Sequence, residues 1–282
     1  MLRIVTDGAG DLPVDWSAHY DIQVIPINIH FGEQTFLQGV DLSNADFYRL
    51  VKESGTIPQT SQPSPQQFED FYRRIASPGD TILSIHVTSK LSGTFASAEI
   101  AARDLSGEYN IIPFDSASGS AALGYMCKEA RMLERGGASI QAILERMEFI
   151  RRNIRILLTL NTLEYARKSG RVKTLQAALA SVLNVKPVVE LCDGVLDMAD
   201  RVRTRRRAID YVVECMAKRL GDRPVNAAIV HAEDPDAGGD LLTKVMAALN
   251  CKELIMTELS ISVAANLGPG TVGIVAYPVE EG

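Results

Sequence analysis

Short apolar runs alternate with amphipathic stretches along most of this chain. The clearest helical pattern covers Ser139–Asn153, where Ser139 is a favourable cap and apolar residues recur along one stripe. Similar patterns predict helices over Ser118–Arg135 and Thr204–Leu220. The runs that predict strands are Arg3–Thr6, Gln23–His30, Thr81–Val87, Asn110–Phe114, Arg155–Thr159, Asn184–Leu191, Asn226–His231, Glu253–Met256 and Thr271–Ala276. This alternation predicts an α/β fold with a mostly parallel sheet flanked by helices.

The length favours two domains rather than one. A chain of 282 residues exceeds the usual size of a single compact core. Charged and polar residues crowd positions 153–171, between two series of strands and helices, without a linker rich in Pro, Gly or Ser. We therefore expect an N-terminal α/β domain over residues 1–160 and a C-terminal α/β domain over 161–282, packed closely together.

Charge and hydropathy exclude several classes of function. The formal net charge of −6 opposes binding to nucleic acid in general. No run approaches the roughly 18 apolar residues of a membrane helix, so we expect no integral membrane segment. The cysteines and histidines are scattered without ligand spacing, which argues against a metal site and favours a reducing, cytoplasmic location. These residues are Cys127, Cys192, Cys215, Cys251, His19, His30, His86 and His231.

Standard catalytic and nucleotide-binding motifs are missing from the sequence. It contains neither a G-x-S-x-G elbow nor a Walker A loop, and we expect no cofactor. The stretch 268–273 matches G-x-G-x-x-G but precedes a predicted strand, so a tight turn is the better interpretation. Asp7, Asp11 and Asp115 fall at predicted strand ends. They could serve in acid–base chemistry or bind a metal, but aspartates are also common turn and cap residues.

Two segments rich in hydroxyl groups stand at predicted helix entrances. In the first, Ser64 and Gln67 form a capping box that starts a helix, which leaves Thr60 and Ser61 outside the cap. In the second, Ser92 follows a buried strand and Gly93 lets the backbone approach a ligand closely. Amide groups, hydroxyl groups and the helix dipole at such a point favour an anion. Two loops of this kind could hold a carboxylate or a phosphate, although helix capping alone also explains some of the hydroxyl groups.

The order and spacing of many short motifs resemble the DegV family of bacterial fatty-acid-binding proteins, nearly end to end. The motifs are Thr6-Asp7, Asp11-Leu12-Pro13, Pro26-Ile27-Asn28, Thr60-Ser61-Gln62-Pro63-Ser64, Ser84-Ile85-His86, Ser89-Lys90-Leu91-Ser92-Gly93-Thr94, Asp115-Ser116, the segment 163–171, Asn184-Val185-Lys186-Pro187, Val202-Arg203-Thr204-Arg205 and Gly268-Pro269-Gly270. The resemblance implies a two-domain protein with a tunnel, between or within the domains, for one long-chain fatty acid such as palmitate.

The resemblance also implies a role. Members of this type present the bound acid to a separate fatty acid kinase, and the acyl phosphate formed there feeds phospholipid synthesis. Such a protein is a carrier, not an enzyme. The residues that correspond to fatty-acid-binding positions are Thr60, Ser61, Ser92, Gly93, Thr94, Arg171 and Asn266. Arg203 corresponds to a residue that engages the kinase.

Position 266 departs from the family pattern, which has histidine there. An asparagine amide can hydrogen-bond a carboxyl group but cannot carry a proton or a positive charge. Two other interpretations stay open from the residues alone. One is a lipid-sensing interaction module, and the other is a serine-dependent hydrolase that uses Ser92.

Overall fold

The computed structural model describes residues 1–172 and 185–279, and its first half is built on a parallel sheet. The strand order is β2 (Ile22–Ile25), β1 (Leu2–Asp7), β6 (Thr81–His86) and β7 (Asn110–Asp115). On one face lie α3 (Pro65–Ile75) and α4 (Thr94–Asp104), whose apolar side chains form a core cluster with those of the sheet. On the other face lies α5 (Ala121–Arg135). The predicted parallel sheet with flanking helices is confirmed here.

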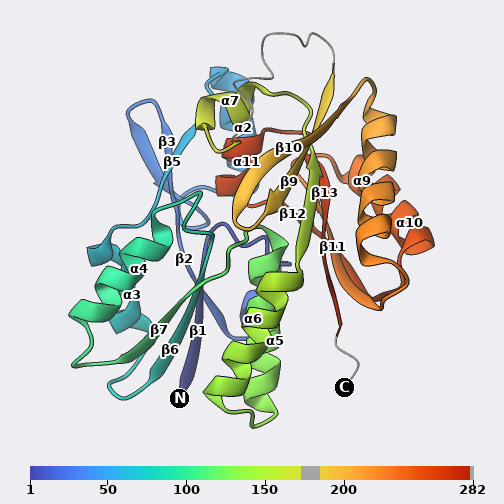
Figure 1. The fold of residues 1–282 in the computed structure, drawn as a ribbon. Helices are drawn as coiled ribbons and strands as arrows, with labels where there is room; N and C mark the ends of the chain where they lie inside the picture. Colours follow the sequence, from blue (N-terminus) through green and yellow to red (C-terminus); the bar gives the residue numbers. More distant parts are fainter. Residues whose placement is uncertain (173–184, 280–282) are drawn as a thin grey trace.

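The second half is built on a six-stranded sheet. Its order is β10 (Val195–Val202), β9 (Lys186–Cys192), β8 (Arg155–Thr159), β13 (Val272–Pro278), β11 (Val225–His231) and β12 (Cys251–Glu258). The outer face is covered by α9 (Arg205–Leu220) and α10 (Pro235–Ala248). The inner face packs on α5 and α6 (Ile140–Asn153), so these two helices stand between the two large sheets (Figure 1).

This second sheet differs from the expected parallel arrangement. Among its neighbouring strands only β11 and β12 run parallel, and the other pairs are antiparallel. One cause is a tight hairpin between β9 and β10 at Asp193 and Gly194, both of which have positive φ. A two-residue turn of this kind joins antiparallel strands. The strand β10 was not predicted.

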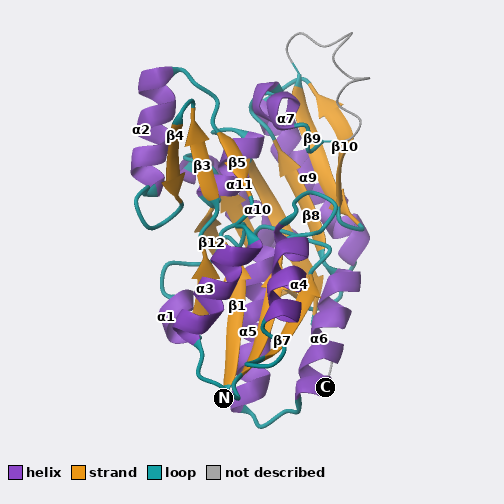
Figure 2. Cartoon of the chain, turned by 90° about the vertical axis from the view of Figure 1, so that its left-hand side faces the viewer, coloured by secondary structure: helices purple, strands orange, loops and turns teal. Residues whose placement is uncertain are grey.

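A small antiparallel sheet lies beyond one end of the four-stranded sheet, above β1 in the view of Figure 2. It contains β4 (Gln34–Leu37), β3 (Asn28–Phe31) and β5 (Gln59–Ser61), with α2 (Asn44–Ser54) packed beside it. The predicted strand Gln23–His30 is in fact two strands, β2 and β3, separated by Pro26. Proline lacks the backbone N–H that a continuous ladder would need, so the chain leaves one sheet and enters another.

The predicted helix starts are largely confirmed. The hydroxyl groups of Ser139 and Thr204 accept hydrogen bonds from the backbone of the first turns of α6 and α9. The exception is α5, which begins at Ala121 instead of Ser118, because Ala117 and Ser120 adopt positive φ in the preceding loop.

Three further helices are short. They are α1 (Trp16–His19), α7 (Glu164–Ser169) and α11 (Ile261–Leu267).

The division into two domains at residue 160 stays a proposal. The strand β8 precedes this residue and pairs within the six-stranded sheet of the second half. In the described part of the chain, no helix combines the length and the apolar character that crossing a membrane requires.

Candidate functional site

A cavity lies where the carboxyl ends of β1, β2, β6 and β7 face the six-stranded sheet. Its volume is about 120 Å³, counted as the space that the centre of a water molecule can occupy. This space would hold several water molecules rather than one. The edge at the carboxyl ends of parallel strands is the usual place for a ligand in α/β folds. The lining comes from segments that are far apart in the sequence.

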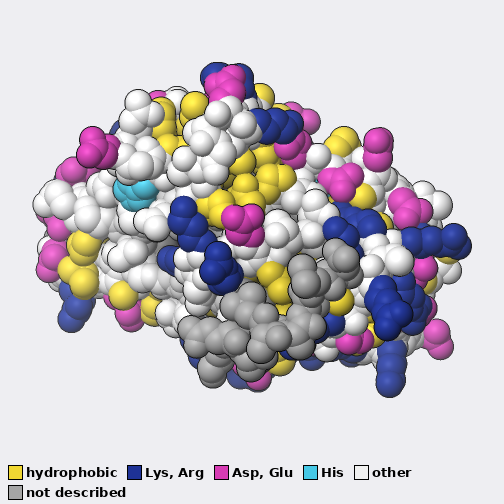
Figure 3. All heavy atoms as spheres, turned by 90° about the horizontal axis from the view of Figure 1, so that it is seen from above, with side chains coloured by type: hydrophobic (Ala, Val, Ile, Leu, Met, Phe, Trp, Pro, Cys, Tyr) yellow, Lys and Arg dark blue, Asp and Glu magenta, His cyan; other side chains and the backbone are white. Residues whose placement is uncertain are grey.

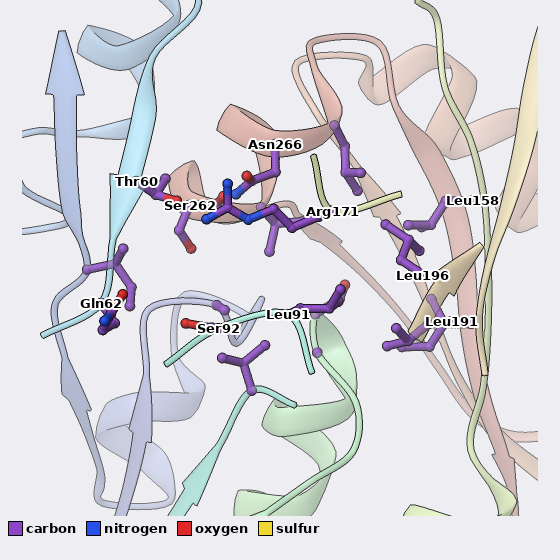
Figure 4. Close-up of a pocket in the computed structure, with 18 of the residues that line it drawn as sticks. Thr60, Gln62, Leu91, Ser92, Leu158, Arg171, Leu191, Leu196, Ser262 and Asn266 are labelled. Carbon is purple, nitrogen blue, oxygen red and sulfur yellow. The ribbon is translucent and has the colours of Figure 1, made fainter. Parts of the chain in front are cut away.

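The lining has a polar part and an apolar part, and Figure 4 shows Thr60, Gln62 and Ser92 on one side of the cavity and Leu158, Leu191 and Leu196 on the other. The polar part contains Thr60, Ser61, Gln62, Ser92, Ser120, Arg171, Ser262 and Asn266. The apolar part contains Ala9, Ile27, Val87, Leu91, Ile156, Leu158, Leu191, Leu196, Val263 and Leu267. Such a division suits an amphipathic ligand with one polar end.

The first hydroxyl-rich segment supplies Thr60 and Ser61 from the edge strand β5. The capping box of Ser64 and Gln67 is present and starts α3 at Pro65. Antiparallel pairing with β3 sets Thr60 opposite Ile29 and Ser61 opposite Asn28. Both hydroxyl residues are half-buried and line the cavity, as their position outside the helix cap suggests.

The second segment supplies Ser92, which lines the same cavity as Thr60 and Ser61. The Ser92 hydroxyl lies 2.8 Å from the Thr94 hydroxyl and accepts a hydrogen bond from the Thr94 backbone N–H. Thr94 is the first residue of α4 and is buried, so its contacts restrict the orientation of the Ser92 hydroxyl group. A methyl group on Gly93 would lie 2.8 Å from the Nε2 atom of Gln62, so the two loops approach each other closely because position 93 has no side chain.

Arg171 supplies the positive charge of the cavity. In the described part of the chain it is the one charged residue in the lining. Its guanidinium group points toward the polar part, where Thr60, Ser262 and Asn266 also lie (Figure 4). Asn266 donates one amide proton to the carbonyl group of Ser262, and its Nδ2 atom has a second proton for a ligand. Donors around a single cation favour an anionic head group.

Sequence reasoning missed two buried serines of the lining, Ser120 and Ser262. Ser120 donates a hydrogen bond from its hydroxyl group to the carboxylate of Asp11, and Asp11 also accepts one from the backbone N–H of Ser260. Burial raises the pKa of Asp11 to about 6 despite these hydrogen bonds, which act in the opposite direction. The Ser262 hydroxyl donates to the carbonyl group of Gly8. The available signal was the Ser260-Ile261-Ser262 pattern at a helix start.

His30 was also missed as a residue of the site. Its Nε2 atom lies 2.8 Å from the Ser61 hydroxyl oxygen, and its Nδ1 atom lies 2.9 Å from the Thr35 hydroxyl oxygen. His30 and Asn28 share one face of β3, and Asn28 is paired with Ser61. The imidazole therefore contacts the hydroxyl group of a residue that lines the cavity.

The hydrolase interpretation gains no support from the surroundings of Ser92. No imidazole or carboxylate within the described ranges is hydrogen-bonded to its hydroxyl group. His86 is fully buried, with Nδ1 3.0 Å from an Asp7 carboxylate oxygen and Nε2 2.7 Å from the Ser84 hydroxyl oxygen. This Ser–His–Asp chain has the order of a catalytic triad, but it lies inside the core and does not contribute to the cavity lining.

The other aspartates singled out in the sequence have structural partners. Asp7 accepts hydrogen bonds from the backbone N–H groups of Ala9 and Val87, and Asp115 accepts one from the Ser89 hydroxyl. These bonds fix the loops after β1 and β6. Within residues 1–172 and 185–279, no group of three or more His, Cys, Asp or Glu could hold a metal ion.

The Gly268-Pro269-Gly270 segment is a tight turn, as predicted. Gly268 and Gly270 have positive φ, and a methyl group on Gly268 would lie 2.8 Å from the Tyr165 ring. The turn follows α11, which carries Ser262 and Asn266. It therefore fixes the end of a helix that lines the cavity.

Arg203 lies between β10 and α9, away from the cavity lining. Its side chain is exposed and makes no hydrogen bond or ion pair with any residue that the structure describes. Nearby arginines have structural partners, since Arg205 pairs with Asp234 and Arg207 with Glu214. Figure 3 shows Lys and Arg side chains interspersed with Asp and Glu on this side of the molecule, where α9 lies.

Comparison with known proteins finds relatives that match this chain in sequence and in fold along nearly its full length. A family model described as "Uncharacterised protein, DegV family" matches residues 1–279. Protein DegV of Bacillus subtilis (strain 168) is 28% identical over 275 residues, which cover 97% of this chain and 98% of that protein. A solved structure of a DegV family protein from Thermus thermophilus, described by its fatty acid binding, is 31% identical with a TM-score of 0.90, covering 99% of both chains. The structure of Bacillus subtilis DegV, described as a fatty acid binding protein, is 26% identical with a TM-score of 0.87, again covering 99% of both chains.

Proposed function

Since the chain belongs to the DegV family, we propose that it binds one long-chain fatty acid in the cavity described above. The carboxylate would contact Thr60, Ser61 and Ser92, with Arg171 and Asn266 beside it. Gly93 and Thr94 would hold Ser92 in place. The tail would lie along the apolar part, against the inner face of the six-stranded sheet.

One observation carries this proposal: a single cavity has polar donors around one cation at one end and aliphatic side chains at the other. The hydroxyl and amide groups can satisfy a carboxylate that would otherwise lose its hydration at a high cost. The aliphatic part offers burial to methylene groups, each contributing about 0.8 kcal/mol. Solved structures of family members that are described as fatty acid binding proteins support the same ligand class.

The direct test is to identify what the purified protein carries. We expect organic extraction of protein produced in a bacterial host, followed by mass spectrometry, to release close to one fatty acid per chain. The Gly93→Phe variant is the matched comparison, because its side chain would push Gln62 and narrow the polar end. An extract of wild-type protein without fatty acid, combined with no uptake of added palmitate, would contradict the proposal.

The further role that we propose is presentation of the carboxylate to a separate fatty acid kinase, which forms the acyl phosphate for phospholipid synthesis. In this role the protein is a carrier in the cytoplasm and not the catalyst. Arg203 is suited to partner binding because it is exposed and has no described partner in the chain itself. An unpaired guanidinium group can bind a carboxylate or phosphate across an interface without first breaking an internal ion pair.

Reversing the charge of Arg203 tests this role separately from lipid binding. For Arg203→Glu we expect acyl phosphate formation with a fatty acid kinase to fall by about tenfold, because an exposed attractive pair becomes a repulsive one. Palmitate affinity should be unchanged, since Arg203 does not line the cavity. Arg207→Glu is the control, because that side chain is already paired with Glu214 on the same helix. Equal losses in both variants would argue against a specific role for Arg203.

A lipid-sensing interaction module is the alternative within the same ligand class. It shares the cavity and the partner surface but does not require acyl phosphate. If the protein carries a fatty acid and binds a kinase partner without supporting acyl phosphate formation, the sensing role replaces the carrier role.

A further inference from the structure

His30 contacts the proposed head-group site through a single hydroxyl group. Its Nε2 atom lies 2.8 Å from the oxygen of Ser61, and Ser61 lines the cavity. The other ring nitrogen is 2.9 Å from the Thr35 hydroxyl oxygen, in a residue paired with His30 across β3 and β4. Both nitrogens of the ring are therefore occupied, and the ring connects Thr35 to the cavity through Ser61.

The position of the ring proton decides what Ser61 can offer to a ligand. A neutral imidazole has one donor nitrogen and one acceptor nitrogen. If Nε2 lacks a proton, the Ser61 hydroxyl must donate to it, and only oxygen lone pairs then face the cavity. If Nε2 carries a proton, it donates to the Ser61 oxygen, and the proton of Ser61 is free for the ligand. In the neutral ring, Nδ1 then accepts a hydrogen bond from Thr35.

We propose that His30 is a positioning residue that donates from Nε2 to Ser61 and so turns the Ser61 hydroxyl proton toward the fatty acid carboxylate. The donors then point in one direction, from Thr35 through His30 and Ser61 to the ligand. A carboxylate only accepts hydrogen bonds, so it requires this direction. This inference rests on the proposed fatty acid binding and adds to it the residue that selects an anionic head group.

Two substitutions separate this role from simple packing. In His30→Gln the side-chain amide can donate to Ser61 while its oxygen accepts from Thr35, so the donor direction is kept. In His30→Leu the Ser61 hydroxyl loses its fixed orientation. The neutral ligand hexadecanol is the internal reference, because its hydroxyl group can donate as well as accept and is therefore indifferent to the direction.

The experiment is a titration of delipidated protein with palmitate and with hexadecanol. For His30→Leu we expect about tenfold weaker palmitate binding, because nothing then holds the Ser61 proton toward the carboxylate and this charge-assisted hydrogen bond is weakened, with hexadecanol affinity within about twofold of wild type. His30→Gln should retain palmitate affinity within about twofold. The control is His19→Leu, on α1 and outside the cavity lining, which should change neither affinity.

The outcomes distinguish this inference from the function on which it rests. Unchanged palmitate binding in His30→Leu, equal losses for both ligands, or failure of His30→Gln to retain affinity would each overturn it. A wild-type protein that binds neither ligand would instead overturn the proposed function and this inference with it. Histidine ¹⁵N resonances of the palmitate-bound wild type provide a measurement without substitution. We expect a proton on Nε2 of His30, and a proton on Nδ1 alone would contradict the proposal.

Discussion

Replacing Leu196 by tryptophan is expected to weaken fatty acid binding by about 100-fold or more. Leu196 lies on β10, is 6% exposed, and points into the apolar part of the cavity (Figure 4). An indole ring there would take the place of about four methylenes of the tail, each worth about 0.8 kcal/mol of burial. The sum of about 3 kcal/mol corresponds to about two orders of magnitude in the dissociation constant.

A second tryptophan on the same strand provides the control for this prediction. Val195 is half-buried and adjacent to Leu196, so its side chain points to the other face of β10 and does not line the cavity. Palmitate titration and thermal unfolding of both variants separate cavity filling from damage to the strand. If Val195→Trp loses affinity as strongly as Leu196→Trp, or if Leu196→Trp binds like wild type, the tail does not lie along β10.

The polar end of the cavity could be predicted because its main signals are local in the sequence. Ser64 and Gln67 determine where α3 begins, and this leaves Thr60 and Ser61 without a capping role. Ser92 likewise lies between a buried strand and a helix start. Neither signal requires knowledge of the sheet order. The sequence alone did not show that the two segments line the same cavity, and this expectation came from the family resemblance. In the structure, residues of both segments line one cavity.

His30 and Ser262 were missed because their roles depend on contacts between distant segments. His30 acts on Ser61, 31 positions away, through the pairing of β3 with β5, and β5 was not predicted. Ser262 donates to Gly8, 254 positions away. A lone histidine in an apolar run gives no indication of such a partner.

The order of the six-stranded sheet was missed for a different reason. Insertion of β13 between β8 and β11 is a tertiary arrangement that local patterns do not encode. The antiparallel hairpin before β10 did have a local signal, since Asp193-Gly194 is a favoured pair for a two-residue turn. The prediction of a mostly parallel sheet relied on the alternation of strands and helices and did not take this turn into account.

The pH dependence of stability should show a specific contribution from Asp11. Its pKa of about 6 in the folded protein exceeds the ordinary value of 3.8 because burial disfavours the charged form. The folded state therefore binds the proton more tightly than the unfolded state, and ionisation above pH 4 destabilises the fold. Two pKa units at 1.36 kcal/mol each amount to about 3 kcal/mol, lost as the pH rises from about 4 to about 6.

Comparison with Asp11→Asn isolates this contribution. The asparagine resembles the protonated carboxyl group: its oxygen can accept from the Ser260 backbone N–H, and its amide can donate to Ser120. In urea unfolding of delipidated protein, we expect the free energy of unfolding of wild type, minus that of the variant, to fall by about 3 kcal/mol between pH 4 and pH 7. Asp46→Asn is the control, because the pH dependence of its contribution to the free energy of unfolding has the opposite sign. The hydroxyl group of Ser43 and the guanidinium group of Arg49 lower the pKa of Asp46, so its small contribution is present at neutral pH and lost on acidification. A difference for Asp11→Asn that stays constant across this range would mean that Asp11 is ionised in the folded protein throughout it, and that the bond to Ser120 at the cavity always involves a carboxylate.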